Sequence, residues 1–184
     1  MCSANTEEDE KTGKQSGRER MAMTMEVAIE INGLTKRYGE KTAVDHLNLR
    51  VFRGEIFGLL GPNGAGKTTT TLMLTGLTEP TEGTAFIGGL DCVRDTMKVK
   101  KTVGYMPDNV GFYGDMTGRE NLRFTAALNG LERKTAEERI EDLLFRTGLA
   151  EAGDQRVGTY SRGMRQRLGV ADVLMKDPQV IIMD

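Results

Sequence analysis

The sequence has few of the residues that build disulfide frameworks, metal clusters or membrane spans. Its 184 residues include no tryptophan, one histidine and two cysteines, Cys2 and Cys92, which lie far apart in the chain. Two such cysteines form neither a disulfide framework nor a metal cluster, and they fit a reducing cytosol. The apolar runs are much shorter than the roughly 20 residues of a membrane-spanning helix. A role at a membrane therefore requires a partner protein.

The charge balance is nearly even, with 25 Lys and Arg against 27 Asp and Glu and a net charge of −2. This balance excludes a global basic field of the kind that attracts nucleic acid. Residues 1–24 are polar and mixed in charge, and such a segment buries too little apolar surface to offset its conformational entropy. We expect it to be disordered. The remaining residues, 25–184, have the length of one ordinary domain.

Alternation of apolar and polar residues predicts short strands early in the chain. Residues 27–31 and 47–51 alternate as half-buried strands do, and 84–87 and 102–105 are two shorter candidates. With the helical patterns that follow, they indicate an α/β protein with a strand-rich N-terminal portion. His46 falls on the polar face of the second strand, with no second histidine or carboxylate cluster nearby. We interpret it as a solvated strand residue.

A glycine-rich stretch stands between a short apolar run and a helical pattern, which predicts a strand at 56–60 and a helix over Lys67–Leu77. Gly61 and Gly66 are five apart and lead at once into Lys67 and Thr68, which is the Walker A pattern. Backbone N–H groups of such a loop curl around phosphate oxygens, and the helix N-terminus points its positive end at the same anion. Lys67 then reaches the β- and γ-phosphates, and the Thr68 hydroxyl lies on Mg²⁺. A tight turn without a ligand would need strand, spacing and Lys-Thr to coincide by chance.

Two capping boxes mark the starts of helices. Thr117 is followed three residues later by Glu120, and Thr135 by Glu138, each close to apolar residues at helical spacing. Gly148 is placed to end the second of these helices. We expect both apolar faces to pack in the core.

A third helix is predicted over Arg162–Met175, with Ser161 as a good N-cap residue and Gly163 in its first turn. Arg162 and Arg165 also lie in that turn, where the helix dipole disfavours cations. Two interpretations are open. Both arginines are simply solvated, or the helix N-terminus is a second anion site.

The run from Val180 to Asp184 consists of four apolar residues and then an acid, which is the form of a Walker B strand. A continuous apolar run is typical of a strand buried on both faces of a parallel sheet. Downstream of a Walker A loop, the Asp184 carboxylate is expected to hold Mg²⁺ beside the Thr68 hydroxyl.

With the Walker A loop, the segment Tyr160-Ser-Arg-Gly-Met-Arg-Gln-Arg167 and the Walker B acid in this order, the sequence resembles the ATP-binding subunits of ABC transporters. Among them it is most similar to the ATPases of ABC-2-type exporters. The resemblance covers nearly everything from Val27 to Asp184. It implies a P-loop NTPase fold, namely a RecA-like core with an N-terminal antiparallel β-subdomain, a helical signature subdomain over about 109–175, and the C-terminal part of the core missing.

The resemblance also implies the ligands and partners. ATP and Mg²⁺ bind, with Tyr38 stacking on adenine and a phosphate loop formed by Gly61, Pro62, Asn63, Gly64, Ala65, Gly66, Lys67, Thr68 and Thr69. The signature residues contact the γ-phosphate held by the opposite subunit, and they are Ser161, Arg162, Gly163 and Met164. The implied unit is a head-to-tail dimer, of two identical or two different subunits, with ATP between them. A transmembrane permease holds it at the cytoplasmic face of the membrane, and no nucleic acid is involved.

Two positions depart from the family pattern. The signature reads Tyr-Ser-Arg-Gly-Met in place of the common Leu-Ser-Gly-Gly-Gln, so Met164 lacks the hydrogen-bonding amide of glutamine. Asp108 stands where the family usually has a glutamine. An aspartate can ligate Mg²⁺ more strongly than an amide oxygen does, but it cannot donate a hydrogen bond when ionised. We expect an altered dependence on Mg²⁺.

The resemblance implies that a glutamate directly follows Asp184 and acts as the base for the attacking water. It also implies a switch histidine and further strands after that glutamate. One of those strands is expected between the Walker A and Walker B strands. We therefore interpret the chain as a fragment of the family domain and expect these residues alone to bind ATP without hydrolysing it. Two alternatives stay open, a non-transport ABC-type ATPase and a non-functional truncated fragment that binds nucleotide weakly.

Overall fold

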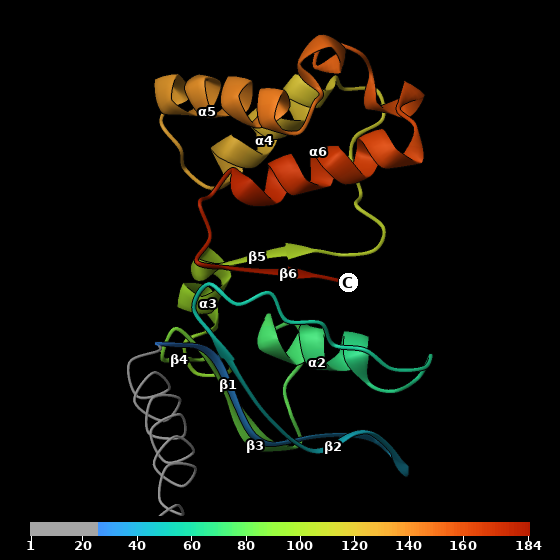
Figure 1. The fold of residues 1–184 in the computed structure, drawn as a ribbon, viewed down its shortest axis with the longest axis vertical. Helices are drawn as coiled ribbons and strands as arrows, with labels where there is room; N and C mark the ends of the chain where they lie inside the picture. The colour runs from blue at the N-terminus through green and yellow to red at the C-terminus, as the bar shows by residue number, and fades with distance from the viewer. Residues whose placement is uncertain (1–25) are drawn as a thin grey trace, which may run out of the picture.

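The computed structural model describes residues 26–184, so the disorder predicted for residues 1–24 lies outside the described residues. Figure 1 shows the elements in tiers along the long axis. An antiparallel sheet lies at one end, a pair of strands lies in the middle, and a group of helices lies at the other end. The mixture of strands and helices confirms the α/β class.

The antiparallel sheet has the strand order β2-β1-β3-β4. Its strands are β1 (Val27–Tyr38), β2 (Lys41–Phe52), β3 (Glu82–Ile87) and β4 (Leu90–Asp91). β1 and β2 form a long hairpin that turns at Gly39, whose φ of +57° suits glycine. The strands predicted at 27–31, 47–51 and 84–87 lie inside β1, β2 and β3, so the strand-rich N-terminal portion is confirmed.

Two short helices pack against this sheet, α2 (Lys67–Leu74) and α3 (Thr96–Thr102). Their buried side chains share one hydrophobic cluster with the sheet, which includes Ile31, Leu34, Met73, Ile87 and Val99. The helix predicted over Lys67–Leu77 is formed, but it ends earlier than predicted, at Leu74. The Thr75 hydroxyl donates to the Thr71 carbonyl there at 2.9 Å, and Gly76 follows with a φ of +65°.

The middle tier consists of two parallel strands, β5 (Val103–Met106) and β6 (Val180–Met183). Val180 and Ile182 pack against the core of the antiparallel sheet, whereas Ile181 and Met183 are 40% and 59% exposed. The prediction that this run is buried on both faces is therefore wrong. Within residues 26–184, β5 is the one strand that pairs with β6, and the alternate side chains of β6 face outwards.

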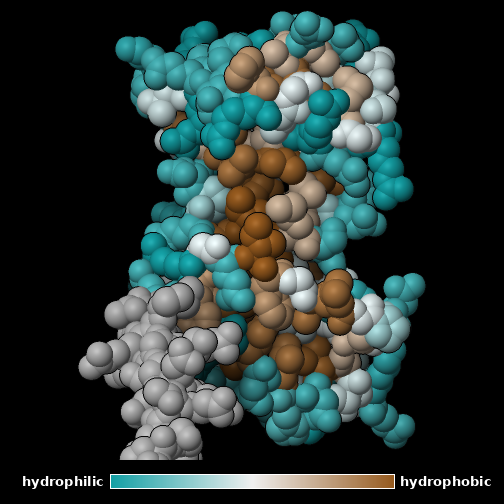
Figure 2. Space-filling view, viewed as in Figure 1, coloured by the Kyte–Doolittle hydropathy of each residue, from teal (hydrophilic) through white to brown (hydrophobic). Residues whose placement is uncertain are grey.

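The strand predicted at 56–60 is not formed. Residues 55–62 have no regular secondary structure, and Leu60 is 91% exposed. A strand is held by hydrogen bonds to a neighbouring strand, and none in residues 26–184 pairs with this segment. Figure 2 shows apolar surface gathered across the middle of this face, at the level of β5 and β6 in Figure 1. The segment has the apolar composition of a core strand without the pairing that would make it one.

Three helices form the far end of the molecule, α4 (Gly118–Leu128), α5 (Arg133–Arg146) and α6 (Arg162–Leu174). Two 3-10 turns, η1 (Ala150–Ala152) and η2 (Val157–Thr159), connect α5 to α6. These helices enclose a second hydrophobic cluster centred on Leu122, Ile140, Leu144 and Leu168. No helix in residues 26–184 is long and apolar enough to cross a membrane.

One of the two predicted capping boxes is formed and the other is not. Thr117 Oγ1 accepts from the Glu120 N–H at 3.1 Å, and the Glu120 carboxylate accepts from the Thr117 N–H at 2.7 Å. The prediction of a capping box at Thr135 is wrong, because α5 begins earlier, with Glu132 as its N-cap. The Glu132 carboxylate accepts from the N–H groups of Lys134 and Thr135 at 3.2 and 3.3 Å, and so takes the role expected of Thr135.

Candidate nucleotide-binding site

The phosphate loop turns on two glycines with left-handed backbone. Gly64 has a φ of +83° and Gly66 a φ of +87°, and Gly66 is the N-cap of α2. A Cβ at Gly66 would lie 2.3 Å from the Ala43 carbonyl oxygen of β2. Only glycine allows this close approach. No side chain caps α2, so the N–H groups of its first turn are available to an anion.

The Lys67 side chain folds back over this loop. Its Nζ donates to the carbonyl oxygens of Gly61 and Pro62 at 2.8 and 2.9 Å. The two carbonyls hold the ammonium at the mouth of the loop, close to the N–H groups of α2. A phosphate there meets a cation as well as backbone donors.

Thr68 and Asp184, which are 116 positions apart in the chain, lie in hydrogen-bond contact. Thr68 Oγ1, in the first turn of α2, donates to Asp184 Oδ1 at 3.2 Å. The Asp184 N–H donates to the Met106 carbonyl at 3.0 Å, which continues the pairing of β5 with β6 and holds the carboxylate in place. A hydroxyl and a carboxylate are oxygen donors of the kind that Mg²⁺ accepts beside water and phosphate.

The third predicted Mg²⁺ partner is not at this point. Asp108 is exposed in the loop after β5, and in the part of the chain that the structure describes it makes no hydrogen bond to Thr68 or Asp184. No group of three or more His, Cys, Asp or Glu among residues 26–184 could hold a metal ion. A magnesium ion at Thr68 and Asp184 therefore depends on phosphate and water oxygens for its other ligands.

The predicted adenine-stacking residue lies at the end of the long hairpin. Tyr38 is the last residue of β1, and its side chain is 51% exposed. A cavity of about 420 Å³ lies between β2 and the phosphate loop, and its lining residues are Thr42, Ala43, Val44, Asp45, Leu47, Leu59, Leu60, Ala65, Lys67 and Thr70. Arg37, next to Tyr38, pairs with Thr42 of that lining. Tyr38 is thus the next residue after Arg37, whose partner Thr42 lines the cavity.

The signature residues lie on the helical end of the molecule. Ser161 is the N-cap of α6, and its Oγ accepts from the Met164 N–H at 3.2 Å. Arg162, Gly163 and Arg165 are exposed. Within residues 26–184, no hydrogen bond joins these residues to the phosphate loop, and Figure 1 shows α6 and α2 in different tiers. Within residues 26–184, the structure does not bring the two helix ends that are predicted to bind anions together into one site.

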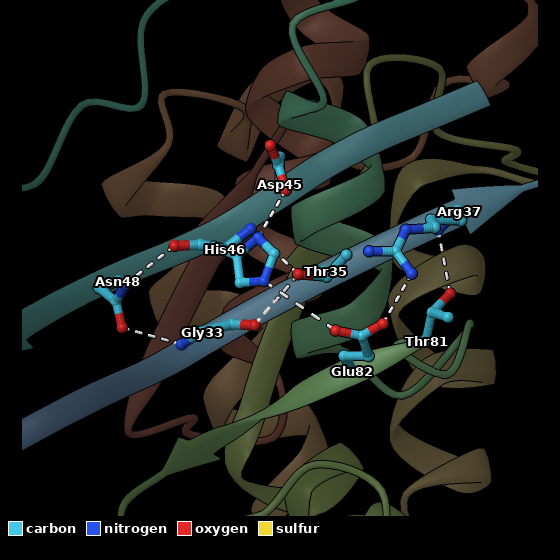
Figure 3. Close-up of polar contacts among 8 residues, drawn as sticks. All are labelled: Gly33, Thr35, Arg37, Asp45, His46, Asn48, Thr81 and Glu82. Carbon is cyan, nitrogen blue, oxygen red and sulfur yellow. Dashed lines mark hydrogen bonds and ion pairs between the residues drawn. The ribbon is translucent and has the colours of Figure 1, made fainter. Parts of the chain in front are cut away.

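His46 is an exposed residue of β2, as predicted, and two single carboxylates lie near its ring (Figure 3). Its Nδ1 lies 2.6 Å from Asp45 Oδ1, and its Nε2 lies 4.0 Å from Glu82 Oε2 of β3. The ring is exposed, as predicted for a surface residue. The backbone has a φ of +45°, and the His46 N–H donates to Thr35 Oγ1 at 3.0 Å. His46 thus lies at an irregularity of the β1–β2 pairing.

The phosphate loop, the Thr68–Asp184 contact and the capped helix at Ser161 occur in the order seen in one family of proteins. The family model described as "ABC transporter" matches residues 44–184. The chain belongs to the ATP-binding proteins of ABC transporters. The P-loop NTPase fold that the resemblance implied is the fold of this family.

Curated relatives of this ABC protein include ATP-binding proteins named for bacitracin transport and for daunorubicin resistance. It is 41% identical over 160 residues to the bacitracin transport ATP-binding protein BcrA of Bacillus licheniformis, covering 87% of this chain and 51% of the relative. It is 40% identical over 159 residues to the daunorubicin resistance ATP-binding protein DrrA3 of Streptomyces coeruleorubidus, covering 86% of this chain and 50% of the relative. The chain spans about half the length of these relatives.

Solved structures agree on the fold. One ATP-binding subunit of an ABC transporter superposes with a TM-score of 0.76 at 29% identity, covering 85% of this chain and 65% of that one. CbiO1 from Clostridium perfringens, part of the ABC transporter complex CbiONQ, superposes with a TM-score of 0.78. Its identity is 24%, over 86% of this chain and 65% of CbiO1, so this likeness shows the fold alone.

Sequence reasoning missed one part of the ABC protein's site. Ala43 and Val44 of β2 form the wall against which Gly66 rests, with the Ala43 carbonyl closest to it. They lie in a strand whose alternation looks ordinary, and the contact joins two segments that are far apart in sequence. No local signal marks them. The sole indication is the need for glycine at position 66.

Proposed function

We propose that this ABC protein binds ATP with Mg²⁺ at the phosphate loop. We propose further that in a whole protein of the relatives' length, ATP binding and hydrolysis drive a membrane partner. The observation that carries the proposal is the 3.2 Å hydrogen bond between Thr68 and Asp184. This bond supports the proposal because it joins two oxygen donors of the kind that Mg²⁺ accepts, beside the N-terminal turn of α2. The Lys67 ammonium lies in the same loop.

Each residue has a separate task in holding the triphosphate. The N–H groups at the start of α2 donate to phosphate oxygens, and Lys67 exchanges its bonds to the Gly61 and Pro62 carbonyls for bonds to phosphate. Thr68 and Asp184 hold Mg²⁺, which neutralises charge on the phosphates when bound. The remaining loop residues, Asn63, Ala65 and Thr69, complete the cradle.

We propose that adenine stacks on Tyr38. The ring is half-exposed at the end of β1, and it lies beside the strand pair that reaches the cavity next to the loop. An exposed aromatic face attracts a purine because stacking removes apolar surface from water on both partners. The cavity offers room between β2 and the phosphate loop.

We propose that the signature residues act on ATP held by a second nucleotide-binding subunit in a head-to-tail dimer. Ser161, Arg162 and Gly163 are exposed at the N-terminus of α6 and are not joined to this chain's own loop by hydrogen bonds in residues 26–184. The Ser161 oxygen accepts a capping bond, and its hydrogen remains available for a phosphate oxygen. Met164 is half-buried and faces the helical cluster.

The partner in transport is proposed to be a transmembrane permease that holds this chain at the cytoplasmic face of a membrane. The relatives named for bacitracin transport and daunorubicin resistance support transport over other uses of the fold. We further propose that residues 25–184 act as one ATP-binding domain, with 109–175 as its helical subdomain. A neighbouring gene that encodes a multi-span membrane protein would support transport. A neighbouring gene for translation or DNA repair would instead favour a non-transport ATPase.

ATP binding is tested by calorimetric titration of the full chain with ATP and Mg²⁺. We expect Lys67→Ala to weaken binding at least about tenfold, since it removes a charged donor to the phosphates. The matched control is Lys101→Ala, which removes an exposed lysine of α3 and should leave the affinity unchanged. A wild-type chain that binds no ATP, or a Lys67 variant that binds as tightly, would contradict the proposal.

A further inference from the structure

The Lys36 side chain makes two specific contacts beside the proposed adenine site. Its Nζ donates to the Glu79 carbonyl at 2.6 Å, in the loop between α2 and β3. The same ammonium lies over the Tyr38 ring, 5.1 Å from the ring centroid. A cation within about 6 Å of an aromatic centroid is attracted to the ring face. One face of Tyr38 is therefore covered by Lys36.

Lys36 and Tyr38 lie on the phosphate-loop side of the hairpin. They are two residues apart in β1, so their side chains point to the same face. Lys36 pairs in register with Val44, and residues opposite each other share a face. A Cβ at Gly66 would come within 3.0 Å of Val44 Cγ2, which places Val44 against the loop. The covered ring thus belongs to the same surface as the phosphate cradle.

The end of β1 is held in place without Lys36. The Arg37 N–H donates to Thr81 Oγ1 at 3.0 Å, and the Thr81 N–H donates to the Thr35 carbonyl at 2.8 Å. The Arg37 guanidinium also pairs with Glu82 at 2.7 Å, as Figure 3 shows. These bonds tie β1 to the start of β3. Loss of the Lys36 side chain should therefore change the surroundings of the Tyr38 ring more than the backbone.

We propose that Lys36 is a positioning residue for recognition of the purine base. Its ammonium, held by the Glu79 carbonyl, covers one face of Tyr38 and fixes the ring so that the other face receives adenine. A ring held in one orientation loses less conformational entropy when a base stacks on it. The inference rests on the proposed function, in which Tyr38 stacks on adenine. It separates two parts of the ligand, because Lys36 serves the base and the loop serves the phosphates.

The test compares ATP with inorganic tripolyphosphate, each with Mg²⁺, by calorimetric titration of the full chain. Lys36→Met keeps the length of the side chain and removes the cation. We expect it to weaken ATP binding about three- to fivefold and to change tripolyphosphate binding less than about twofold. Lys36→Arg should bind ATP about as tightly as wild type, because a guanidinium both donates hydrogen bonds and stacks on aromatic faces. Lys101→Met is the control for loss of a lysine charge.

A double-mutant cycle with Tyr38→Leu isolates the ring. In the Tyr38→Leu chain, Lys36→Met should have no further effect on ATP binding, because there is no ring left to position. Equal weakening of ATP and tripolyphosphate by Lys36→Met would overturn the inference in favour of a structural or purely electrostatic role. Full ATP affinity in Lys36→Met, or no rescue by arginine, would also overturn it.

Failure of the proposed function gives a different result. If wild type and Tyr38→Leu both bind ATP no better than tripolyphosphate, then Tyr38 does not stack on adenine, and the inference falls with that assignment. If wild type prefers ATP and Tyr38→Leu loses the preference while Lys36→Met keeps it, stacking stands and only the role of Lys36 is rejected.

Discussion

Thr68 Oγ1 lies 3.2 Å from Asp184 Oδ1, although the two residues are 116 positions apart. One is in the first turn of α2 and the other directly follows β6. The pairing of β6 with β5 sets the position of the carboxylate, and the turn at Gly66 sets that of the hydroxyl. The candidate metal site therefore depends on two structural units that lie far apart in the sequence.

Asp184→Asn should weaken ATP binding in the presence of Mg²⁺ and not in its absence. With the metal present, loss of the carboxylate removes a ligand and should weaken binding by about tenfold or more. Without the metal, the carboxylate is a negative charge beside the phosphates, so its removal should leave ATP binding unchanged or strengthen it. Calorimetric titrations in Mg²⁺ and in a chelator measure both.

The control for this charge change is Asp177→Asn. Asp177 is exposed, has a φ of +53° that asparagine also tolerates, and precedes the same strand. It should leave both titrations unchanged. Equal loss of affinity with and without Mg²⁺ in Asp184→Asn would contradict a metal-binding role.

Gly66→Ala and Gly64→Ala should differ sharply in stability and in ATP binding. Both glycines have left-handed backbone, which costs another residue about 1–2 kcal/mol. A Cβ at Gly64 meets nothing within 4 Å, whereas one at Gly66 lies 2.3 Å from the Ala43 carbonyl. Gly66→Ala should lose about a further 1–3 kcal/mol of unfolding free energy and should disrupt the loop. Urea unfolding and ATP titration of the two variants measure the difference, and similar losses in both would contradict the packing argument.

Asp172→Asn should make stability less dependent on pH. Asp172 is half-buried on α6, where the Thr125 hydroxyl of α4 donates to its carboxylate. Burial raises the pKa of Asp172, and the Thr125 hydrogen bond and the Lys176 charge oppose this in part. A carboxyl whose pKa is higher in the folded state stabilises the protein below its usual pKa, about 4, and this is lost as pH rises through the folded value.

The variant should therefore have a higher free energy of unfolding than the wild type at pH 7, with a gap that closes towards pH 4. Asparagine keeps the acceptor for Thr125 and removes the charge. Urea unfolding at a series of pH values measures the gap. Asp142→Asn is the control, since Asp142 is an exposed partner of Arg146 on α5. A constant gap across the pH range would rule out ionisation of Asp172 as the cause.

Asp108→Gln tests the position where the resemblance to the family predicts a glutamine. Asp108 is exposed and makes no hydrogen bond to Thr68 or Asp184 in residues 26–184, so any contact with Mg²⁺ requires the loop to move or a water to bridge. We expect the variant to need more Mg²⁺ for half-maximal ATP binding, with a smaller shift than Asp184→Asn produces. An unchanged Mg²⁺ dependence would remove Asp108 from the metal site.

The polypeptide of residues 1–184 should bind ATP without steady turnover. The residues gathered at the site are Lys67, Thr68 and Asp184. The proposed function gives each of them the task of holding phosphate or Mg²⁺, which leaves none of the three to act as the base for an attacking water. Release of phosphate over several hours in excess ATP measures turnover. Steady release that disappears in Lys67→Ala would show that a base is present after all.

Features that depend on neighbours in sequence could be predicted from the sequence. The box between Thr117 and Glu120 and the cap at Ser161 are local hydrogen bonds, and both are formed. The second predicted box, at Thr135, is not formed, because the Glu132 carboxylate lies earlier in the chain and caps the first N–H groups of α5 instead. Lys67 and its loop could likewise be identified, since glycine spacing and the Lys-Thr pair lie within a few residues.

The sequence by itself therefore determined the phosphate loop, most strands and helices, and the family. The tertiary structure alone decided which distant groups meet, such as Thr68 with Asp184 and Glu82 with His46. It also decided that 56–60 is not a strand and that β6 is exposed on one face. The physical reason is that a strand and a metal site both need partners from elsewhere in the chain, whereas a cap or a tight loop carries its partners within one or two turns.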